Sequence, residues 1–280
     1  MTLNGDPRIH LTGLTKRFGA TLALDHLSLK IAAGEVFALL GPNGAGKTTT
    51  IKLMCGLLRP TDGRVTVNGF DVGEASLEAK ADLAYVPDQP YMYPKLTGRE
   101  FLRFVCDLYR LPPAKADPAI EALIDLFEMG DYVDDLSQNY SHGMKQRVVM
   151  AAALVHDPHV LVVDEPMVGL DPKSSRLVKD ILRDRAEQGA SVFISTHTLS
   201  VAEEVSDRVG ILHHGRLVAL GPPAEIIRSR GQSRTLEDAF LAITAEEKGP
   251  GPFSANGLHG TENADCEKGT RSLFSGEGEE

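Results

Sequence analysis

One stretch decides the fold: Gly41-Pro42-Asn43-Gly44-Ala45-Gly46-Lys47-Thr48-Thr49. It fits the phosphate-loop pattern, in which four residues separate two glycines and a lysine and a hydroxyl residue follow the second glycine. An apolar run at 35–40 precedes the loop, as is typical of a buried parallel strand, and apolar residues recur at helical spacing over 50–58. An ordinary strand–turn–helix junction with chance glycines is the alternative, and the complete pattern with both flanks argues against it.

The chemistry of this loop is that of an anion site. Glycines let the backbone curl so that successive N–H groups converge on phosphate oxygens. The dipole of the helix that follows favours negative charge at the same place. Lys47 would reach the β- and γ-phosphates, and the Thr48 hydroxyl would ligate Mg²⁺. The stretch therefore predicts binding of a nucleoside triphosphate.

Composition excludes several other classes. The chain has 280 residues, of which 42% are hydrophobic and 24% charged, the profile of a soluble globular protein. No apolar run approaches the ~20 residues of a membrane helix, and the first ten residues lack the pattern of a secretory signal. A net charge of −10 argues against broad nucleic-acid binding. Cys55, Cys106 and Cys266 lack metal-ligand spacing, and we expect reduced thiols in a cytosolic protein.

Residues before 87 predict a small antiparallel sheet. Short strands are expected at 9–11, 22–24, 27–31 and 65–67, and Asn68-Gly69 after the last is a strong hairpin signal. Glycines between these apolar runs indicate turns that separate the strands. We expect this sheet beside the parallel strand that leads into the phosphate loop.

Residues 87–158 change to a helical pattern. Thr97 with Glu100 forms a capping box for one helix, and a second helix is expected around 118–129. Ser141 is suited to be the N-cap of a third helix that runs to about 156.

Strands and helices alternate again after residue 158. The expected elements are strands at 160–163, 190–195, 209–212 and 216–220 and helices at 174–188, 198–205 and 236–244. We therefore predict an α/β fold, a P-loop NTPase core with a mostly parallel sheet, a small antiparallel β-subdomain and an inserted α-helical subdomain. The expected divisions are 1–86 (β-subdomain and first part of the core), 87–157 (helical subdomain), 158–245 (second part of the core) and an acidic tail, 246–280, predicted to be disordered.

Four further motifs accompany the phosphate loop. They are Tyr140-Ser141-His142-Gly143-Met144-Lys145-Gln146-Arg147, the apolar strand that ends in Asp164-Glu165-Pro166, Gly169-Leu170-Asp171-Pro172, and Ser195-Thr196-His197. From the residues alone, Asp164 lies where a phosphate-loop NTPase holds Mg²⁺, and Glu165 is placed to orient or deprotonate a water molecule. In this order and at these spacings the five motifs resemble the ATP-binding cassette (ABC) ATPases, from residue 8 to about 244.

The resemblance implies two cassettes facing head to tail, with each ATP between the phosphate loop of one copy and the signature segment (residues 140–144) of the other. Ser141, the Gly143 N–H and Met144 would then contact the nucleotide of the partner copy. A helix N-terminus is a ready anion site, which agrees with this arrangement. The partner is expected to be a second copy or a relative.

The resemblance also implies the roles of single residues. Glu165 would be the catalytic base, with Lys47 on the phosphates, and His197 would read the γ-phosphate. Asp171 would belong to the dimer contact, and Phe18 would stack on the adenine, although an aromatic residue in a small sheet is more often part of the core. His26, His213 and His214 are expected to be structural or surface residues.

Two departures from the family pattern stand out. The family carries a glutamine near the Mg²⁺ ion where this chain has Asp88, with Gln89 one place later, and either residue could take that role. The signature segment reads Tyr-Ser-His-Gly-Met instead of Leu-Ser-Gly-Gly-Gln, so His142 replaces a glycine.

A single motif set without a long heptad insertion predicts a stand-alone cassette that drives transmembrane permease subunits in a separate polypeptide. Residues 88–97, with Tyr91-Met92-Tyr93-Pro94, are expected to form the surface on which the permease docks, because exposed aromatic residues suit an interface. The motifs resemble the export or multidrug branch, and the expected location is the cytoplasmic face of a membrane. The alternative is a soluble, non-transport ABC ATPase that acts in regulation or on nucleic acid, although no nucleic-acid partner is expected from the charge.

Overall fold

The structure, a computed structural model, describes residues 8–229 and 234–246. Its main sheet has six strands in the order β10-β9-β3-β8-β7-β6. All neighbouring pairs are parallel except β9 with β10. The strands are β3 (Val36–Leu40), β6 (Leu83–Val86), β7 (Val160–Asp164), β8 (Ser191–Thr196), β9 (Arg208–His213) and β10 (Arg216–Gly221). The carboxyl ends of β3, β7 and β8 therefore meet at one edge, where an open parallel sheet binds its ligands.

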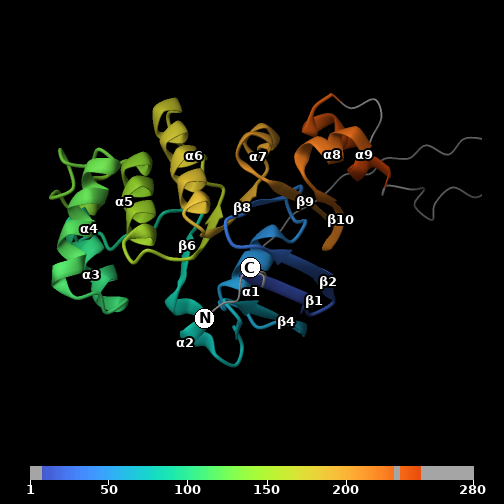
Figure 1. Ribbon diagram of the computed structural model, residues 1–280, viewed down its shortest axis with the longest axis horizontal. Helices are drawn as coiled ribbons and strands as arrows, with labels where there is room; N and C mark the ends of the chain where they lie inside the picture. Colours follow the sequence, from blue (N-terminus) through green and yellow to red (C-terminus); the bar gives the residue numbers. More distant parts are fainter. Residues whose placement is uncertain (1–7, 230–233, 247–280) are drawn as a thin grey trace, which may run out of the picture.

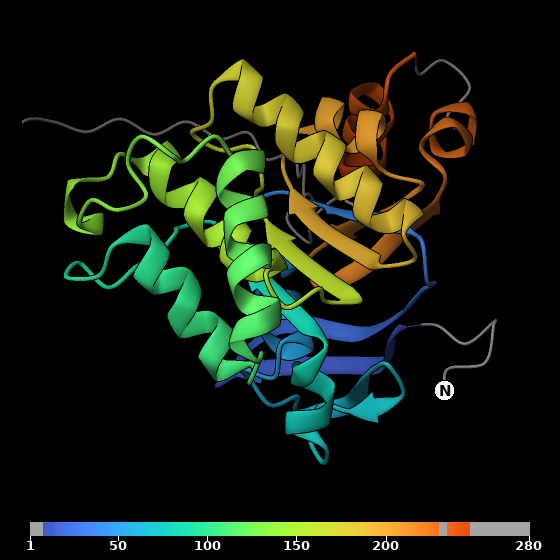
Figure 2. The ribbon, with the colours of Figure 1, turned by 60° about the vertical axis from the view of Figure 1, so that its left-hand side comes forward.

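The two faces of this sheet belong to two different hydrophobic clusters. On β3, Ala38 packs into the cluster that contains the helices α5 (His142–Leu154), α6 (Pro172–Glu187) and α7 (Leu199–Val205). Phe37, the next residue on the strand, packs into the other cluster with α1 (Lys47–Met54) and the antiparallel sheet. Alternation along the strand thus lets one fully buried strand join both layers. Figures 1 and 2 show α6 and α7 over the sheet, with α1 on the side of the antiparallel strands.

The second sheet is antiparallel, in the order β2-β1-β4-β5, as predicted. The three short strands expected over 9–31 are in fact two long ones, β1 (Ile9–Phe18) and β2 (Thr21–Ile31). Gly13, at φ +56°, lies inside β1, where the register shifts between Leu11 and Leu14, so this glycine makes a bulge and not a strand end. The Asn68-Gly69 turn between β4 (Asp62–Val67) and β5 (Phe70–Asp71) is confirmed, with φ of +50° and +82°.

Three helices gather at one end of the molecule, away from the antiparallel sheet (Figure 1). They are α3 (Gly98–Leu108), α4 (Pro113–Leu126) and α5. The capping box of Thr97 and Glu100 and the Ser141 N-cap are confirmed. The expected start of the second helix near 118 is wrong, because α4 begins at Pro113 and contains Pro118. A proline at the first helical position has its φ already set for the helix and lacks only an N–H that would be unpaired there.

Short elements complete the fold. The structure adds α2 (Ser76–Ala81), β6, α8 (Pro223–Ser229) and a 3₁₀ turn (Ser137–Asn139), none of which the sequence predicted. The last described helix, α9 (Leu236–Glu246), packs on α7 and α8. Glu246 ends this helix instead of starting the tail, and the rest of the predicted disordered tail lies outside the described residues. Across the two described ranges, none of the helices is long and apolar enough to cross a bilayer.

The packing between the two layers generates a stability prediction. The rings of Phe37 and Phe193 stack with centroids 5.8 Å apart, and both side chains are fully buried. We expect Phe193→Ala to lower the free energy of unfolding by about 3–5 kcal/mol. The substitution removes the transfer free energy of the buried ring and leaves a cavity where the ring contacts were. Leu77→Ala is the control, since Leu77 is 83% exposed and its truncation should change the value by less than about 0.5 kcal/mol. Urea titrations measure both, and equal effects of the two variants would contradict the packing described.

His156 generates a pH prediction. Its ring stacks on Tyr109 with centroids 3.6 Å apart, and burial lowers the pKa of His156 from 6.5 to about 4. The unfolded chain therefore binds the proton more tightly than the folded chain between about pH 6.5 and 4, so stability falls as the pH falls through that window. From pH 7 to pH 5 we expect a loss of about 2 kcal/mol from this residue, absent in His156→Phe. Unfolding titrations at both pH values test this, and parallel losses in the two proteins would contradict it.

Candidate functional site

The phosphate-loop stretch connects β3 to α1, as predicted. A Cβ at Gly46, whose φ is +113°, would lie 2.7 Å from the Ala23 carbonyl oxygen, and a Cβ at Gly41 would collide with the Leu212 carbonyl oxygen. Both glycines are thus required by the close approach of β2 and β9 to the loop. The tip of the loop (Pro42, Asn43 and Gly44) is exposed, and Gly44, at φ +81°, has open space around its Cβ position.

Lys47, at the first helical position of α1, curls back over the loop. Its Nζ donates to the carbonyl oxygens of Gly41 at 2.6 Å and Pro42 at 3.3 Å, and the residue is 8% exposed. Burial lowers the pKa of Lys47, while the charges of Asp164 and Glu165 act in the opposite direction. An ammonium group at the end of a phosphate loop can pair with an anion that binds in the loop. The hydroxyl residues Thr48 and Thr49 follow on the first turn of α1, with Thr48 exposed.

Asp164 ends β7 and lies in register with Ser195 of β8. It is 3% exposed, and burial is the main cause that raises the pKa of its carboxyl group. The negative charges of Asp88 and Glu165 raise it further, which means that three carboxylates share this edge of the sheet. The Ser195 side chain and the positive charge of Lys47 act in the opposite direction and lower the pKa of Asp164.

Glu165 follows at φ +50°, and three groups at the end of β8 hold its carboxylate. Thr196 Oγ1 donates to Oε2 at 3.0 Å, the His197 N–H donates to Oε1 at 3.1 Å, and His197 Nδ1 lies 2.7 Å from the same oxygen. The Glu165 N–H donates to the Ser195 carbonyl oxygen at 2.8 Å. The Glu165 side chain is 17% exposed and that of His197 is 60% exposed. The carboxylate is therefore largely buried by the groups that orient it, while the imidazole remains accessible to solvent. A carboxylate fixed in this way can orient a water molecule or accept its proton.

A pocket of about 680 Å³ is lined by Glu165 and His197, whereas Lys47, Thr48 and Asp164 are not among its lining residues. Its lining comes from five separate stretches of chain: Asn43, Asp88, Gln89, Pro90, His142, Lys145, Glu165, Val168 and His197. Asp88 and Gln89 both line it, so the two residues left open by the sequence share this wall. The first turn of α5 forms another wall, which the sequence did not predict for the same copy of the chain.

Ser141, Gly143 and Met144 lie at the exposed start of α5. Ser141 Oγ accepts from the Met144 N–H at 3.3 Å. A Cβ at Gly143 would meet nothing within 4 Å in the described chain. His142 packs against Gly169, whose φ is +75°. A Cβ at Gly169 would lie 2.7 Å from Cδ2 of the His142 imidazole. The histidine that departs from the family pattern therefore contacts the turn after β7, a long-range contact without a sequence signal.

Asp171 caps α6, and Arg147 connects it to the helices of the other end. The Asp171 carboxylate accepts from the Ser174 N–H at 3.0 Å and from the Ser174 hydroxyl, which lower its pKa. Arg147 donates to Ser174 Oγ at 2.6 Å and to the Phe127 carbonyl oxygen at 3.1 Å. The sequence includes Arg147 in a motif, but the motif gave no sign of this role.

Phe18 lies at the tip of the β1–β2 hairpin, paired with Thr21, and is 48% exposed. Lys16 Nζ lies 5.0 Å from its ring centroid. The same hairpin supplies Ala23, whose carbonyl oxygen approaches Gly46 of the loop. The core alternative for Phe18 does not hold, because nearly half of the residue is accessible.

The donor set fits a magnesium ion, which the resemblance implies. Asp164 offers a buried carboxylate in an acidic environment, and Thr48 offers a hydroxyl at the end of the phosphate loop. Mg²⁺ takes few protein ligands and relies on phosphate oxygens and waters for the rest.

A second hollow, of about 270 Å³, lies between α3, α5 and the segment after β6. Its lining includes Tyr91, Phe101, Leu108 and Tyr109. Tyr91 and Leu108 are 68% and 64% exposed, so aromatic and aliphatic surface is accessible there. Met92, which the sequence places on this surface, is instead 5% exposed and packs in the hydrophobic core.

Comparison with known proteins places this geometry in a family. A family model described as ABC transporter matches residues 24–168. The chain is 36% identical over 243 residues to a probable multidrug ABC transporter ATP-binding protein of Escherichia coli. The aligned region covers 85% of this chain and 42% of that protein. The chain is 38% identical over 241 residues to the daunorubicin/doxorubicin resistance ATP-binding protein of Streptomyces peucetius, with 85% and 73% covered.

A solved structure of the ATP-binding subunit of an ABC transporter superposes with a TM-score of 0.80 at 31% identity, over 84% of this chain and 99% of that one. The chain thus spans less than half of the length of the Escherichia coli relative and nearly all of the solved subunit. The family predicted from the five motifs is confirmed. Since the family model covers just over half of the chain and the relatives cover most of it, this protein belongs to the ABC transporter family.

Proposed function

We propose that this chain binds and hydrolyses ATP, closes with a second cassette on MgATP, and powers a separate membrane permease in the export direction. One observation carries the hydrolytic part: the Glu165 carboxylate is oriented by Thr196 and His197 at a pocket that also includes the loop residue Asn43. A base held beside a phosphate loop suits attack of water on a γ-phosphate.

The proposed ligand set follows from the same geometry. The backbone amides of residues 41–49, with Lys47, hold the phosphates, and Phe18 stacks on the adenine ring. Thr48 and Asp164 hold Mg²⁺, with Asp88 or Gln89 acting through its water shell. The ion supplies charge neutralisation of the phosphates. Glu165 takes the proton of the attacking water, and His197 holds Glu165 in place while it faces the γ-phosphate.

The need for a second cassette is supported by the start of α5. Ser141 is exposed and Gly143 has free space around it, so nothing within the described chain requires a glycine at that position. An exposed helix N-terminus favours an anion, and the open space around Gly143 leaves room for one. Ser141, the Gly143 N–H and Met144 would contact the γ-phosphate held by the other copy, with Asp171 at the dimer contact.

The export direction and the permease rest on the relatives and on the second hollow. Both named relatives are described as multidrug or drug-resistance ATP-binding proteins. The exposed Tyr91 and Leu108 offer an apolar docking surface to a permease segment, at the cytoplasmic face of a membrane. We further propose that residues 87–157 form a helical subdomain that carries this surface, inserted between the two core parts, 1–86 and 158–245.

The proposal predicts the behaviour of Glu165→Gln. The amide cannot accept the proton, so ATP turnover should fall at least ~100-fold, while MgATP binding persists and dimers accumulate. Phosphate release and light scattering on a sizing column measure the two effects. Glu187→Gln, at the exposed end of α6, is the matched control and should keep its turnover. A Glu165→Gln protein that hydrolyses ATP at the normal rate as a monomer would refute the proposal.

The docking surface gives a second prediction. From detergent-solubilised membranes of the source organism, the tagged chain should co-purify a protein with several apolar spans of ~20 residues each. Tyr91→Asp should abolish this capture, because a charge in an apolar interface core is strongly unfavourable. Leu77→Asp places the same charge at an exposed apolar residue on α2 and should leave capture intact. Equal capture by both variants would contradict docking at this hollow.

A further inference from the structure

An exposed cluster of aromatic side chains lies on a segment that is hydrogen-bonded to the loop that leads into the signature segment. Tyr93 is 46% exposed and its ring contacts those of Tyr91 and Phe104, with centroids 5.8 and 5.6 Å apart. We call these three residues the aromatic patch. The patch is part of the surface to which the permease is proposed to dock.

Hydrogen bonds join the segment 93–99, which carries Tyr93, to the segment 133–140. The bonds are Ser137 Oγ to the Tyr93 carbonyl oxygen (2.8 Å), Gln138 N–H to Pro94 (3.3 Å), Ser137 N–H to Leu96 (2.9 Å), Arg99 N–H to Val133 (3.0 Å) and Gly98 N–H to the Tyr140 hydroxyl (3.0 Å). Thr97 and Leu136 form an isolated antiparallel bridge between the same two segments. The two segments are thereby connected along their whole length.

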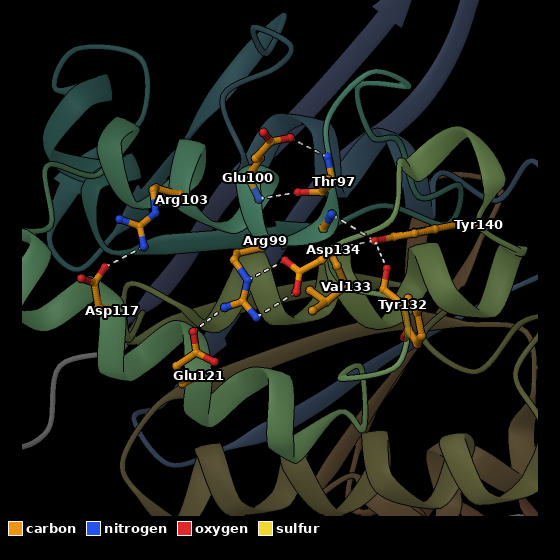
Figure 3. Close-up of polar contacts among 11 residues, drawn as sticks. Thr97, Arg99, Glu100, Arg103, Asp117, Glu121, Tyr132, Val133, Asp134 and Tyr140 are labelled. Atoms are coloured by element: carbon orange, nitrogen blue, oxygen red, sulfur yellow. Dashed lines mark hydrogen bonds and ion pairs between the residues drawn. The ribbon is translucent and has the colours of Figure 1, made fainter.

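The Tyr140 hydroxyl is the buried end of this connection, shown in Figure 3. Tyr140 is 6% exposed, and its hydroxyl accepts from the Gly98 N–H and donates towards the carbonyl oxygens of Tyr132 at 2.8 Å and Val133 at 3.2 Å. A Cβ at Gly98 would lie 2.9 Å from this oxygen, so only glycine allows the approach. One hydroxyl therefore fixes the start of α3 against the turn at 132–133.

The ion pairs around this centre are exposed and contribute less to its position. Figure 3 also shows Arg99 paired with Asp134, at 2.7 Å, and with Glu121, and Arg103 paired with Asp117, at 2.9 Å. The carboxylates of these pairs are more than half exposed, and exposed pairs are weak and screened by salt. The buried hydroxyl, with its three partners, has no such screening.

Tyr140 is also joined directly to Ser141, the N-cap of α5 and the residue proposed to meet the partner's nucleotide. The family pattern has a leucine at this position, which offers no group to the Gly98 N–H. The aromatic patch is therefore connected to Ser141 by the backbone from Tyr93 to Gly98, the Gly98–Tyr140 hydrogen bond and the peptide bond that follows Tyr140.

We propose that the Tyr140 hydroxyl is a positioning group that fixes Ser141 relative to the aromatic patch, so that closure of the nucleotide sandwich and the arrangement of the patch are coupled. The inference rests on the proposed function, because it requires a sandwich that closes on MgATP. Coupling of two sites is reciprocal in binding, so nucleotide-driven closure must change the patch, and occupation of the patch must change closure.

The absence of tryptophan from the chain allows a direct test. In a Glu165→Gln background, Tyr93→Trp places a single fluorescent reporter in the patch. We expect MgATP to change the emission of this reporter as dimers form. Adding Tyr140→Phe should weaken the ATP-dependent dimer about tenfold and remove most of the emission change per dimer formed, while ATP affinity of the monomer stays within about twofold. The split between dimerisation and ATP binding is not expected of general destabilisation.

Two further variants complete the design. Tyr132→Phe is the matched control, since the Tyr132 hydroxyl takes no part in the Gly98–Tyr140 hydrogen bonds, and the reporter response should persist. Gly98→Ala displaces the Tyr140 hydroxyl from the other side and should act like Tyr140→Phe. An unchanged response per dimer in Tyr140→Phe, or a reporter that stays silent while dimers form, would overturn the inference alone. If MgATP produces no dimer in any of these proteins, the proposed function itself fails.

Discussion

Burial of charge at the carboxyl ends of β3, β7 and β8 is the constraint on which the rest of this structure depends. Asp164 is 3% exposed and Lys47 8%, and burial shifts the pKa of each group towards its neutral form. Burial disfavours the charged form of both groups, because desolvation opposes each charge. We propose that MgATP relieves both penalties at once, because its phosphates would meet the lysine and its metal ion the carboxylate.

The parts of the fold that were predictable have local causes. The capping box of Thr97, the Ser141 cap and the Asn68-Gly69 turn each depend on residues within three or four positions, and each is found where the sequence indicates. The bulge at Gly13 could not be predicted, because it depends on the register of β1 against β2, which no local pattern encodes. The start of α4 was misplaced because either Pro113 or Pro118 could open a helix.

The site shows the same division between chemistry and arrangement. The motifs gave the identity of Lys47, Asp164 and Glu165, because each chemistry allows few residue types at those positions. They did not give the contact of His197 with Glu165, which arises because β7 and β8 pair with Asp164 opposite Ser195. That register is set by packing across the whole sheet, and the contact of His142 with Gly169 likewise depends on how α5 sits over it.

Tyr140 illustrates why a buried polar connection is used where an apolar one would pack as well. A leucine against Gly98 would gain stability from burial, but it would tolerate small shifts of α3, since apolar contact is not directional. A hydroxyl shared by the Gly98 N–H and two carbonyl oxygens has one favourable arrangement, and any shift leaves a buried polar group unpaired. The connection therefore contributes a defined position more than it contributes stability. Because Ser141 follows Tyr140 in the chain, that position is passed to the exposed start of α5, which we propose to meet the nucleotide of a partner copy.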